Sequence, residues 1–508
     1  MTVHDLTGLT LDPDNRRELV AGEKTTWILE KLLLIAALYF ILTYFVLASL
    51  RAQYPFELEW MEGGMIDHIE RILQGKPLYA EPSLEFTSYI YAPLYFYAAA
   101  LLSKITWVGF GAARFVSIVS SIWCLLVVFL IVYRQTENRD WGLMAAGLFA
   151  ATFRISGAWF DLARVDTLYL ALMLTVLYVT LFCRSRASGV LAGLAMALAC
   201  LTKQNGLILA AAFALYYLFF DKRAAVFIAV VATAVGGVSL KWNLESDGWY
   251  FFYLFELPSN HPIFPGRYTT FWTEDILPHL PVVVSVTAVW LLSSQLWKDR
   301  PKAVLWVLVV VSTVGSSLLG RVHSGGYDNV LMPAYAILAV SFGLGISSIH
   351  KKLLTDRNTY RNRMAILCGL CLLQFALLIY DPAAQVPTDN DMRAGMSLLS
   401  DIRKRQGDVL IPFHGRLGRL AGKRSWAHQM ALHDVIRGSE AYGESIRDQI
   451  NDYVSERRFS AIVLDRPWND PFLKGNYILE DSIHACNQCF YPVTGYRVRP
   501  EVILVPSK

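Results

Sequence analysis

Long apolar runs separated by short polar segments dominate the chain up to residue 380. Most of these runs are roughly 17–20 residues long, which is about the length a helix needs to cross a hydrocarbon core of about 30 Å. The pattern therefore predicts eleven membrane-spanning helices. The predicted spans are Leu32–Leu50, Arg114–Tyr133, Trp141–Gly157, Asp166–Phe182, Ser188–Leu201, Gly206–Phe220, Ala224–Leu240, Leu280–Trp297, Ala303–Leu319, Val330–Ile349 and Met364–Tyr380.

One further apolar run, Tyr91–Trp107, is ambiguous by hydrophobicity alone. Lys and Arg concentrate in cytoplasmic loops, and every second loop after residue 133 is basic, as is the segment before the first span. Placing all of these on the cytoplasmic side requires an even number of crossings before Arg134. We therefore expect Tyr91–Trp107 to lie in the outer interface, where its aromatic residues are favoured. The N-terminus is then cytoplasmic and the C-terminus is outside.

Two further segments complete the predicted organisation. Glu62–Gln74 has one apolar stripe at helical spacing, so it is predicted to be a second interfacial helix. After Tyr380 the hydropathy falls, and helical patterns alternate with short apolar strands, which is typical of a small α/β domain. The predicted helices of this domain are Met392–Lys404 and Ser445–Arg457, and its predicted strands are Asp408–Pro412, Ala461–Asp465 and Val502–Val505.

The predicted fold class is an all-α polytopic membrane protein with a small C-terminal soluble α/β domain. Residues 1–31 form a cytoplasmic segment, residues 32–380 the membrane module, and residues 381–508 the outer domain. Within the module, residues 51–113 form the first outer loop with both interfacial helices. The apolar run Leu32–Leu50 is too long for the core of a cleavable signal peptide and is predicted to be an anchor.

Composition narrows the classes of function. The chain is 55% hydrophobic and 17% charged with a mean hydropathy of +0.38, whereas soluble proteins have about 25% charged residues. The net charge of +4 is spread over loops, which disfavours nucleic-acid binding. The spans are almost free of ionisable side chains, which disfavours an ion-coupled transporter. The cysteines show no metal-site spacing, and an oxidising compartment would permit a disulfide between Cys486 and Cys489 without requiring one.

Candidate chemistry gathers on the outer face. Three acids, Glu57, Glu59 and Glu62, follow the first span directly, and isolated cations occur in outer loops where topology does not require them. An anionic ligand such as a phosphate would explain these cations, because Arg and Lys hold phosphate through charge-assisted hydrogen bonds. The other polar residues of these loops are Asp161, Arg164, Asp166, Lys203, His261, Arg267, Arg321, His323, Tyr327, Asp328 and Asn329.

Each of these residues also has an ordinary structural interpretation. Lys203 and Arg321 could extend from helix ends to the lipid headgroups, and Asp166 could cap the helix that it begins. The histidines could be hydrogen-bonded loop residues, and the three acids could form a solvated turn. Their joint placement on one face favours the functional interpretation.

Several short motifs, in their order and topology, resemble the C-type membrane glycosyltransferase superfamily. That group includes the lipid A aminoarabinose transferase, protein O-mannosyltransferases and the catalytic subunits of oligosaccharyltransferases. Two departures are present: Met61 precedes Glu62 where many relatives have Asp-Glu, and Ala92 stands where some have Lys. The motifs are ELEWMEGG followed by ILQGKPLY, then YAPLYFY, LARVDTLYL, LTKQ and YDNVLMPAY.

The resemblance implies inverting transfer of a sugar from a polyprenyl mono- or diphosphate to a lipid, glycan or protein acceptor, at the outer face of the inner (plasma) membrane. The general base is then Glu59 or Glu62, and Asp166 orients the acceptor or the base. Oxygen ligands would also suit Mg²⁺ or Mn²⁺ between Glu59 and Asp166. The expected donor-phosphate residues are Arg164, Lys203, Arg321, Arg267 and His261, and the expected acceptor-binding residues are Asp161, Tyr91, His323, Tyr327 and Asn329.

Two alternatives stay open from the sequence. A transporter or flippase for lipid-linked sugars would also need phosphate-binding cations, but not the pairing of Glu59 or Glu62 with Asp166. A non-catalytic subunit of a glycan assembly complex would keep a degenerate site, and the Met61 departure is compatible with that.

Overall fold

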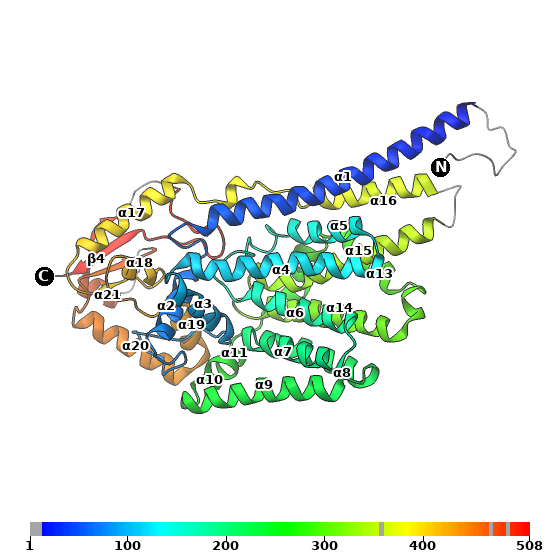
Figure 1. Ribbon diagram of the computed structural model, residues 1–508. Coiled ribbons are helices and arrows are strands. Elements are labelled where there is room, and N and C mark those ends of the chain that lie inside the picture. The colour runs from blue at the N-terminus through cyan, green and yellow to red at the C-terminus, as the bar shows by residue number, and fades with distance from the viewer. Residues whose placement is uncertain (1–12, 355–359, 467–470, 484–487, 508) are drawn as a thin grey trace.

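A computed structural model describes residues 13–354, 360–466, 471–483 and 488–507. Its helices lie side by side in a long bundle, and the C-terminal elements gather at one end of that bundle (Figure 1). Each of the eleven predicted spans coincides with a helix. These helices are α1 (Pro13–Ala52), α4 (Phe110–Thr136), α5 (Arg139–Ala151), α6 (Asp166–Phe182), α7 (Arg186–Thr202), α8 (Gly206–Phe220), α9 (Ala224–Glu245), α13 (Pro281–Leu291), α14 (Arg300–Val322), α15 (Met332–Leu353) and α16 (Tyr360–Ala376).

Length and hydropathy confirm a multi-pass membrane protein in general terms. Among the described residues, five helices are long and apolar enough to cross a membrane alone, and one bent pair would make a sixth span. Helices α6, α7 and α8 are apolar but shorter. These criteria therefore do not establish all eleven crossings, and the full count remains a prediction.

Three predicted spans end earlier than expected. Helix α16 stops at Ala376 rather than Tyr380. Helix α5 stops at Ala151 rather than Gly157; Gly157 itself has a φ of +71°, outside the helical region, and a Cβ there would lie 2.8 Å from the Tyr327 ring. Helix α13 stops at Leu291, and only a short 3₁₀ turn, Leu296–Lys298, follows within the predicted span.

Segment 241–279, which links two predicted spans, is mostly helical. Its aromatic residues show no clean helical period: Tyr250 and Tyr253 are buried, whereas Phe255 and Trp272 are exposed. Beyond the end of α9, the pieces are α10 (Trp249–Phe251), the π-helix η1 (Phe252–Glu256), α11 (Leu257–Ser259), α12 (Arg267–Thr270) and the π-helix η2 (Phe271–Ile276).

The two predicted interfacial helices are α2 (Glu62–Leu73) and α3 (Leu94–Ile105). Twelve residues of α3 rise about 18 Å, which is less than the hydrocarbon core of about 30 Å. Both helices lie at the bundle end that carries the C-terminal elements (Figure 1).

The C-terminal region contains a four-stranded sheet of order β1-β2-β4-β3. Strand β1 (Val409–Leu410) pairs in parallel with β2 (Ala461–Leu464), while β4 (Val502–Pro506) pairs antiparallel with β2 and with β3 (Tyr477–Ser482). The polar edge strand β3 was not predicted, and Cys486 lies outside the described residues. The helices are α17 (Asp389–Lys404), α18 (Gly415–Leu420), α19 (Gln429–Gly438), α20 (Glu440–Ser455) and α21 (Pro471–Asn476).

This region rests on the segment between α1 and α4. The Ala427 backbone N–H donates to the Leu84 carbonyl at 3.0 Å, and that of Thr494 donates to the Leu58 carbonyl at 3.2 Å. One hydrophobic cluster includes Met65 of α2 and Leu432 of α19. Residues far apart in the sequence therefore meet over the segment that carries Glu57, Glu59 and Glu62.

Candidate active site

The three acids of the motif FELEWME are each held by a cationic side chain from a different part of the fold. All three carboxylates are buried, so each needs a partner to offset the cost of leaving water. The pairs are Glu57 with His414, Glu59 with Arg164, and Glu62 with Arg114.

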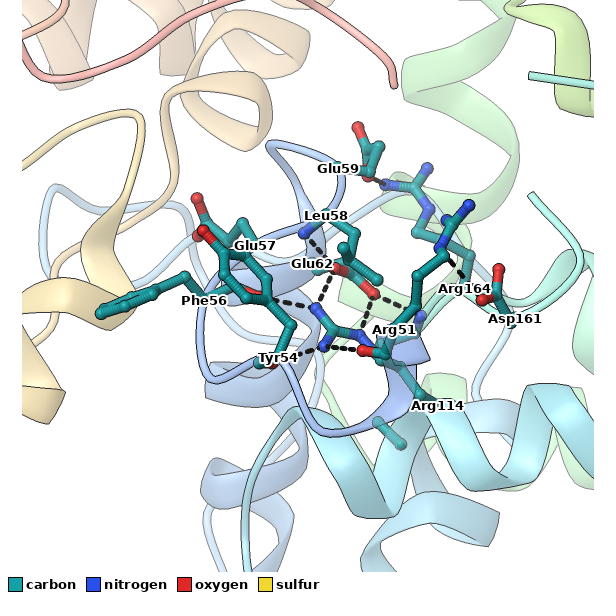
Figure 2. A network of polar contacts seen from close by, with 12 residues as sticks. Arg51, Tyr54, Phe56, Glu57, Leu58, Glu59, Glu62, Arg114, Asp161 and Arg164 are labelled. Carbon is teal, nitrogen blue, oxygen red and sulfur yellow. Dashed lines mark hydrogen bonds and ion pairs between the residues drawn. The ribbon is translucent and has the colours of Figure 1, made fainter. Parts of the chain in front are cut away.

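Arg114 of α4 fixes the shape of the acidic segment (Figure 2). Its Nε and Nη2 donate to the two Glu62 oxygens at 3.0 and 2.7 Å. Its Nη1 and Nη2 also donate to the carbonyls of Tyr54 and Phe56, at 2.6 and 2.7 Å. One fully buried guanidinium thus holds the turn that leads from α1 into α2.

Glu62 has no free acceptor position. Besides Arg114, the backbone N–H groups of Leu58 and Ala163 each donate to it at 2.7 Å. Burial alone would raise the pKa of Glu62, but Arg114 and these amides outweigh burial and hold it below its usual value. A carboxylate this stabilised is a poor general base, and Glu62 does not line the cavity described below.

Glu59 is in a different environment. Its Oε2 lies 3.1 Å from Arg164 Nη1, and Arg164 Nη2 donates to the Tyr91 hydroxyl at 2.6 Å. Burial raises the pKa of Glu59 to about 7, even though Arg164 pulls it back down. A carboxyl group that titrates near neutral pH suits general base catalysis.

The C-terminal region closes over Glu59. Gly495 has a φ of +79°, and a Cβ at that position would lie 2.8 Å from Glu59 Cγ. Glycine is therefore required both by the backbone conformation and by the close approach. Glu59 lies between the membrane module and the loop containing Gly495.

Asp166, the first residue of α6, gathers three side chains. Its Oδ1 accepts hydrogen bonds from Lys203 Nζ at 2.6 Å and Asn329 Nδ2 at 3.0 Å, and its Oδ2 accepts one from Trp159 Nε1 at 2.9 Å. All three partners line the cavity, whereas Asp166 stands behind them. Asp166 therefore positions these side chains; it does not cap α6, whose N-cap residue is Val165 and which has no side-chain capping hydrogen bond.

A cavity of about 620 Å³ connects these groups. Part of its lining is apolar, with Ile208, Leu254, Leu319 and Val330, and part is polar. Of the residues predicted from the sequence, the cavity brings together Glu59, Tyr91, Arg164, Lys203, His323, Tyr327 and Asn329.

Other predicted residues have structural partners away from the cavity. Asp161 forms a buried pair with Arg51 at 3.0 Å. Arg321 pairs with Asp275 at 2.7 Å, and Arg267 donates to the backbone carbonyl of Arg321 in the last turn of α14 and to that of Gly326 in the loop that follows. His261 is buried against α19, and burial lowers its pKa to about 4, so it is neutral at pH 7 and is not a phosphate-binding cation.

Sequence reasoning missed the contribution of the C-terminal region. Asp434 and Arg437 of α19 and Tyr496 line the cavity, and Arg437 Nη1 donates to the Ser324 hydroxyl at 2.7 Å. The signal in the sequence was small, because an Asp and an Arg three residues apart are common on exposed helices.

A buried acid–imidazole–acid group was missed as well. His414 Nδ1 contacts Glu57, and His414 Nε2 lies 3.0 Å from Asp465. Burial alone would lower the pKa of His414, but the two flanking carboxylates raise it to about 10. A charged imidazole thus connects the sheet region to the residue two positions before Glu59.

No group of three or more His, Cys, Asp or Glu side chains able to hold a metal ion occurs among the described residues. Glu59 faces a guanidinium and Asp166 faces an ammonium group, so cationic side chains lie directly beside both carboxylates.

Comparison with known proteins identifies the family. The sequence profile of glycosyltransferase family 87 matches residues 89–376, more than half of the chain. No curated protein sequence matches the chain.

Solved structures show the same fold. ArnT from Cupriavidus metallidurans in the apo state has a TM-score of 0.59 at 13% identity, over 95% of this chain and 98% of that chain. The same enzyme bound to undecaprenyl phosphate has a TM-score of 0.59 at 12% identity, over 92% and 97%. The Archaeoglobus fulgidus oligosaccharyltransferase tethered with an acceptor peptide has a TM-score of 0.54 at 13% identity, over 84% and 68%. This chain therefore belongs to glycosyltransferase family 87 and has the C-type membrane glycosyltransferase fold that its motifs predict.

Proposed function

We propose that this protein is an inverting glycosyltransferase that moves a hexose or pentose from a polyprenyl-phosphate donor to an acceptor hydroxyl. The observation that carries the proposal is one cavity lined by both Glu59, whose pKa burial raises to about 7, and the cations Arg164 and Lys203. Acid–base chemistry and phosphate recognition are thereby available side by side.

Glu59 acts as the general base. It accepts the proton of the acceptor hydroxyl while that oxygen bonds to the anomeric carbon, and the bond from this carbon to the phosphate oxygen breaks. Attack from the face opposite the phosphate inverts the anomeric centre. A positioned carboxylate of this kind contributes about 10²–10⁴-fold to the rate.

Arg164 and Lys203 stabilise the leaving phosphate. Negative charge grows on the phosphate oxygen as the bond to the sugar breaks, and cations in a site shielded from water stabilise that charge most effectively. Asp166, which holds both Lys203 and Asn329, keeps the ammonium group at the cavity. Tyr91, His323, Tyr327 and Asn329 surround the sugar and the acceptor.

The lipid nature of the donor is supported by the neighbours and by the apolar cavity wall. One similar structure contains undecaprenyl phosphate, and an Archaeoglobus fulgidus oligosaccharyltransferase, with a TM-score of 0.52, contains dolichol-phosphate. In this chain, Ile208 and Leu319 are among the apolar residues that line the same cavity as Lys203. A polyprenyl chain is the kind of substituent that such a wall accommodates.

The proposed topology has eleven crossings, with residues 1–31 cytoplasmic and the cavity and residues 381–508 on the outer side of a plasma membrane. It rests on the basic loops and on α3 being too short to cross. The acceptor is a lipid, a glycan or a protein that reaches the cavity from this side.

The direct test uses the full chain in proteoliposomes with a polyprenyl-phosphate-linked sugar and candidate acceptors. We expect a new glycosidic bond of inverted configuration, together with free polyprenyl phosphate, both measured by mass spectrometry and NMR. Movement of intact donor across the bilayer without any glycoside would instead identify a transporter. If the donor binds but neither glycoside formation nor donor movement is detected, the protein would be a non-catalytic subunit.

Lys203→Ala should weaken use of the donor about 10- to 100-fold in kcat/KM, since a hydrogen bond to a charged group contributes about 1.5–3 kcal/mol. The measurement is initial rate against donor concentration. Lys104→Ala removes an exposed lysine from the end of α3 and should change nothing. Unchanged donor kinetics for Lys203→Ala would reduce that lysine to a structural partner of Asp166.

A further inference from the structure

A second polar cavity, of about 250 Å³, lies between the ends of α4, α6, α8 and α14. These helix ends are at the end of the bundle away from the sheet region (Figure 1). Three of the side chains that line it are cationic: Arg134, Arg184 and Lys302. Nothing in the proposed reaction uses this cavity.

Within the described ranges, two of these three cations lack a carboxylate partner, and the third has only a distant one. Among the described residues, neither Arg134 nor Lys302 forms an ion pair; Arg134 donates only to the Tyr178 hydroxyl, at 2.9 Å. The carboxylate that Arg184 approaches, Asp221, is 3.7 Å away and is already held by Arg223 at 2.6 Å.

The opposite end of the bundle provides the contrast. There Arg51, Arg114, Arg164, Lys203 and Arg321 each pair with a carboxylate within 3.1 Å. In the described part of the chain, Arg134 and Lys302 therefore lack the close carboxylate partner that holds each of these five cations. Helix C-termini attract cations on their own, but that attraction does not explain Lys302, which lies near the N-terminus of α14.

One further polar group points to a ligand with acceptor oxygens. Gln135 lines the cavity, and its Nε2 is buried without an acceptor among the described residues. The lining has one carboxylate, Asp299, which is exposed and whose Oδ1 caps α14 by accepting the Lys302 backbone N–H at 3.2 Å. Three cations and a free amide donor therefore outnumber the single acid of the lining.

The surroundings favour a lipid over a soluble anion. Leu181, Phe182 and Leu305 contribute an apolar part of the lining. On α8, the turn containing Tyr216 continues into Leu218 and Phe219, which are 60% and 72% exposed. Acyl chains can cover these residues while a headgroup occupies the cavity. Basic pockets between helices on the cytoplasmic side are recognised sites for anionic headgroups.

We propose that this cavity binds the phosphate headgroup of an anionic phospholipid. Arg134, Arg184 and Lys302 contact the phosphodiester oxygens, and the Gln135 amide donates to a further headgroup oxygen. The site is separate from the catalytic cavity and does not depend on the proposed reaction.

The test compares two variants of equal charge in nanodiscs of phosphatidylcholine, with and without phosphatidylglycerol. The first carries Arg134→Gln, Arg184→Gln and Lys302→Gln. The control carries Arg139→Gln, Arg186→Gln and Lys222→Gln, which remove three exposed cations at the same end but outside the cavity lining. Native mass spectrometry counts retained lipids, and thermal unfolding measures stabilisation by phosphatidylglycerol.

We expect the wild type and the control to retain a phosphatidylglycerol molecule and to unfold at a higher temperature in its presence. The cavity variant should bind that lipid at least about tenfold more weakly and should lose the temperature shift. Equal loss in both variants would overturn the proposal in favour of general surface attraction. Equal protection by glycerol 3-phosphate in phosphatidylcholine alone would overturn the lipid assignment in favour of a soluble phosphate ester.

If the triple variant does not yield folded protein, Lys302→Gln alone serves as the probe, with Lys222→Gln as its control. Removal of one cation should still weaken lipid retention relative to that control. Identical lipid retention by both single variants would contradict the proposal.

Discussion

Glu59→Gln is expected to abolish sugar transfer, with kcat lowered about 10²–10⁴-fold, while the protein stays folded. The amide keeps an oxygen that can accept from Arg164, now 3.1 Å from the carboxylate, but it cannot take a proton from the acceptor. The measurement is the single-turnover rate in proteoliposomes. Glu81→Gln, which removes an exposed acid of the same loop, should retain full activity.

The pH dependence follows from the same residue. Burial raises the pKa of Glu59 to about 7, and only the ionised form accepts a proton. The rate should therefore rise with pH and level off above about pH 7. A fully active Glu59→Gln variant, or a rate that does not change across this range, would show that the base lies elsewhere.

Arg114→Met should cost about 3–5 kcal/mol of unfolding free energy, because breaking a buried ion pair leaves Glu62 charged and without its partner. It should also release the carbonyls of Tyr54 and Phe56. Thermal unfolding in detergent measures the loss. Arg458→Met, in the exposed pair with Glu456, should leave the unfolding temperature nearly unchanged, because an exposed ion pair contributes little to stability.

A second substitution separates the structural role of the Arg114–Glu62 pair from the role of the catalytic base. Adding Glu62→Leu to Arg114→Met should recover part of the stability, since no buried charge is then left unpaired. Equal stability of wild type and Arg114→Met would mean that Arg114 does not hold the segment that carries Glu57, Glu59 and Glu62.

The sequence predicts the membrane module well because long apolar runs determine helices locally. Two predicted spans, Asp166–Phe182 and Gly206–Phe220, agree with α6 and α8 at both ends. The interfacial helices are found for the same reason. The broken helices between residues 249 and 276 are not found, because their aromatic residues show no clean helical period.

The site was less predictable, because it depends on contacts between distant residues. Glu59 and Glu62 are indistinguishable in the sequence, and only the contact between Glu62 and Arg114, 52 residues away, separates their roles. Similarly, Glu57 meets His414 at a separation of 357 residues. Local spacing contains no information about such pairs, so the choice of base stayed open until the fold was known.

The closure of Gly495 and Tyr496 over Glu59 has a consequence for biosynthesis. Chains emerge from the ribosome N-terminus first, and domains fold in that order. The helices of the bundle therefore insert into the membrane before the segment that contains Gly495 and Tyr496, and that completes the cavity around Glu59, has been synthesised. A chain interrupted before this segment would be integrated in the bilayer but would leave its carboxylate open to water, so competence for transfer is acquired only at the last stage of synthesis.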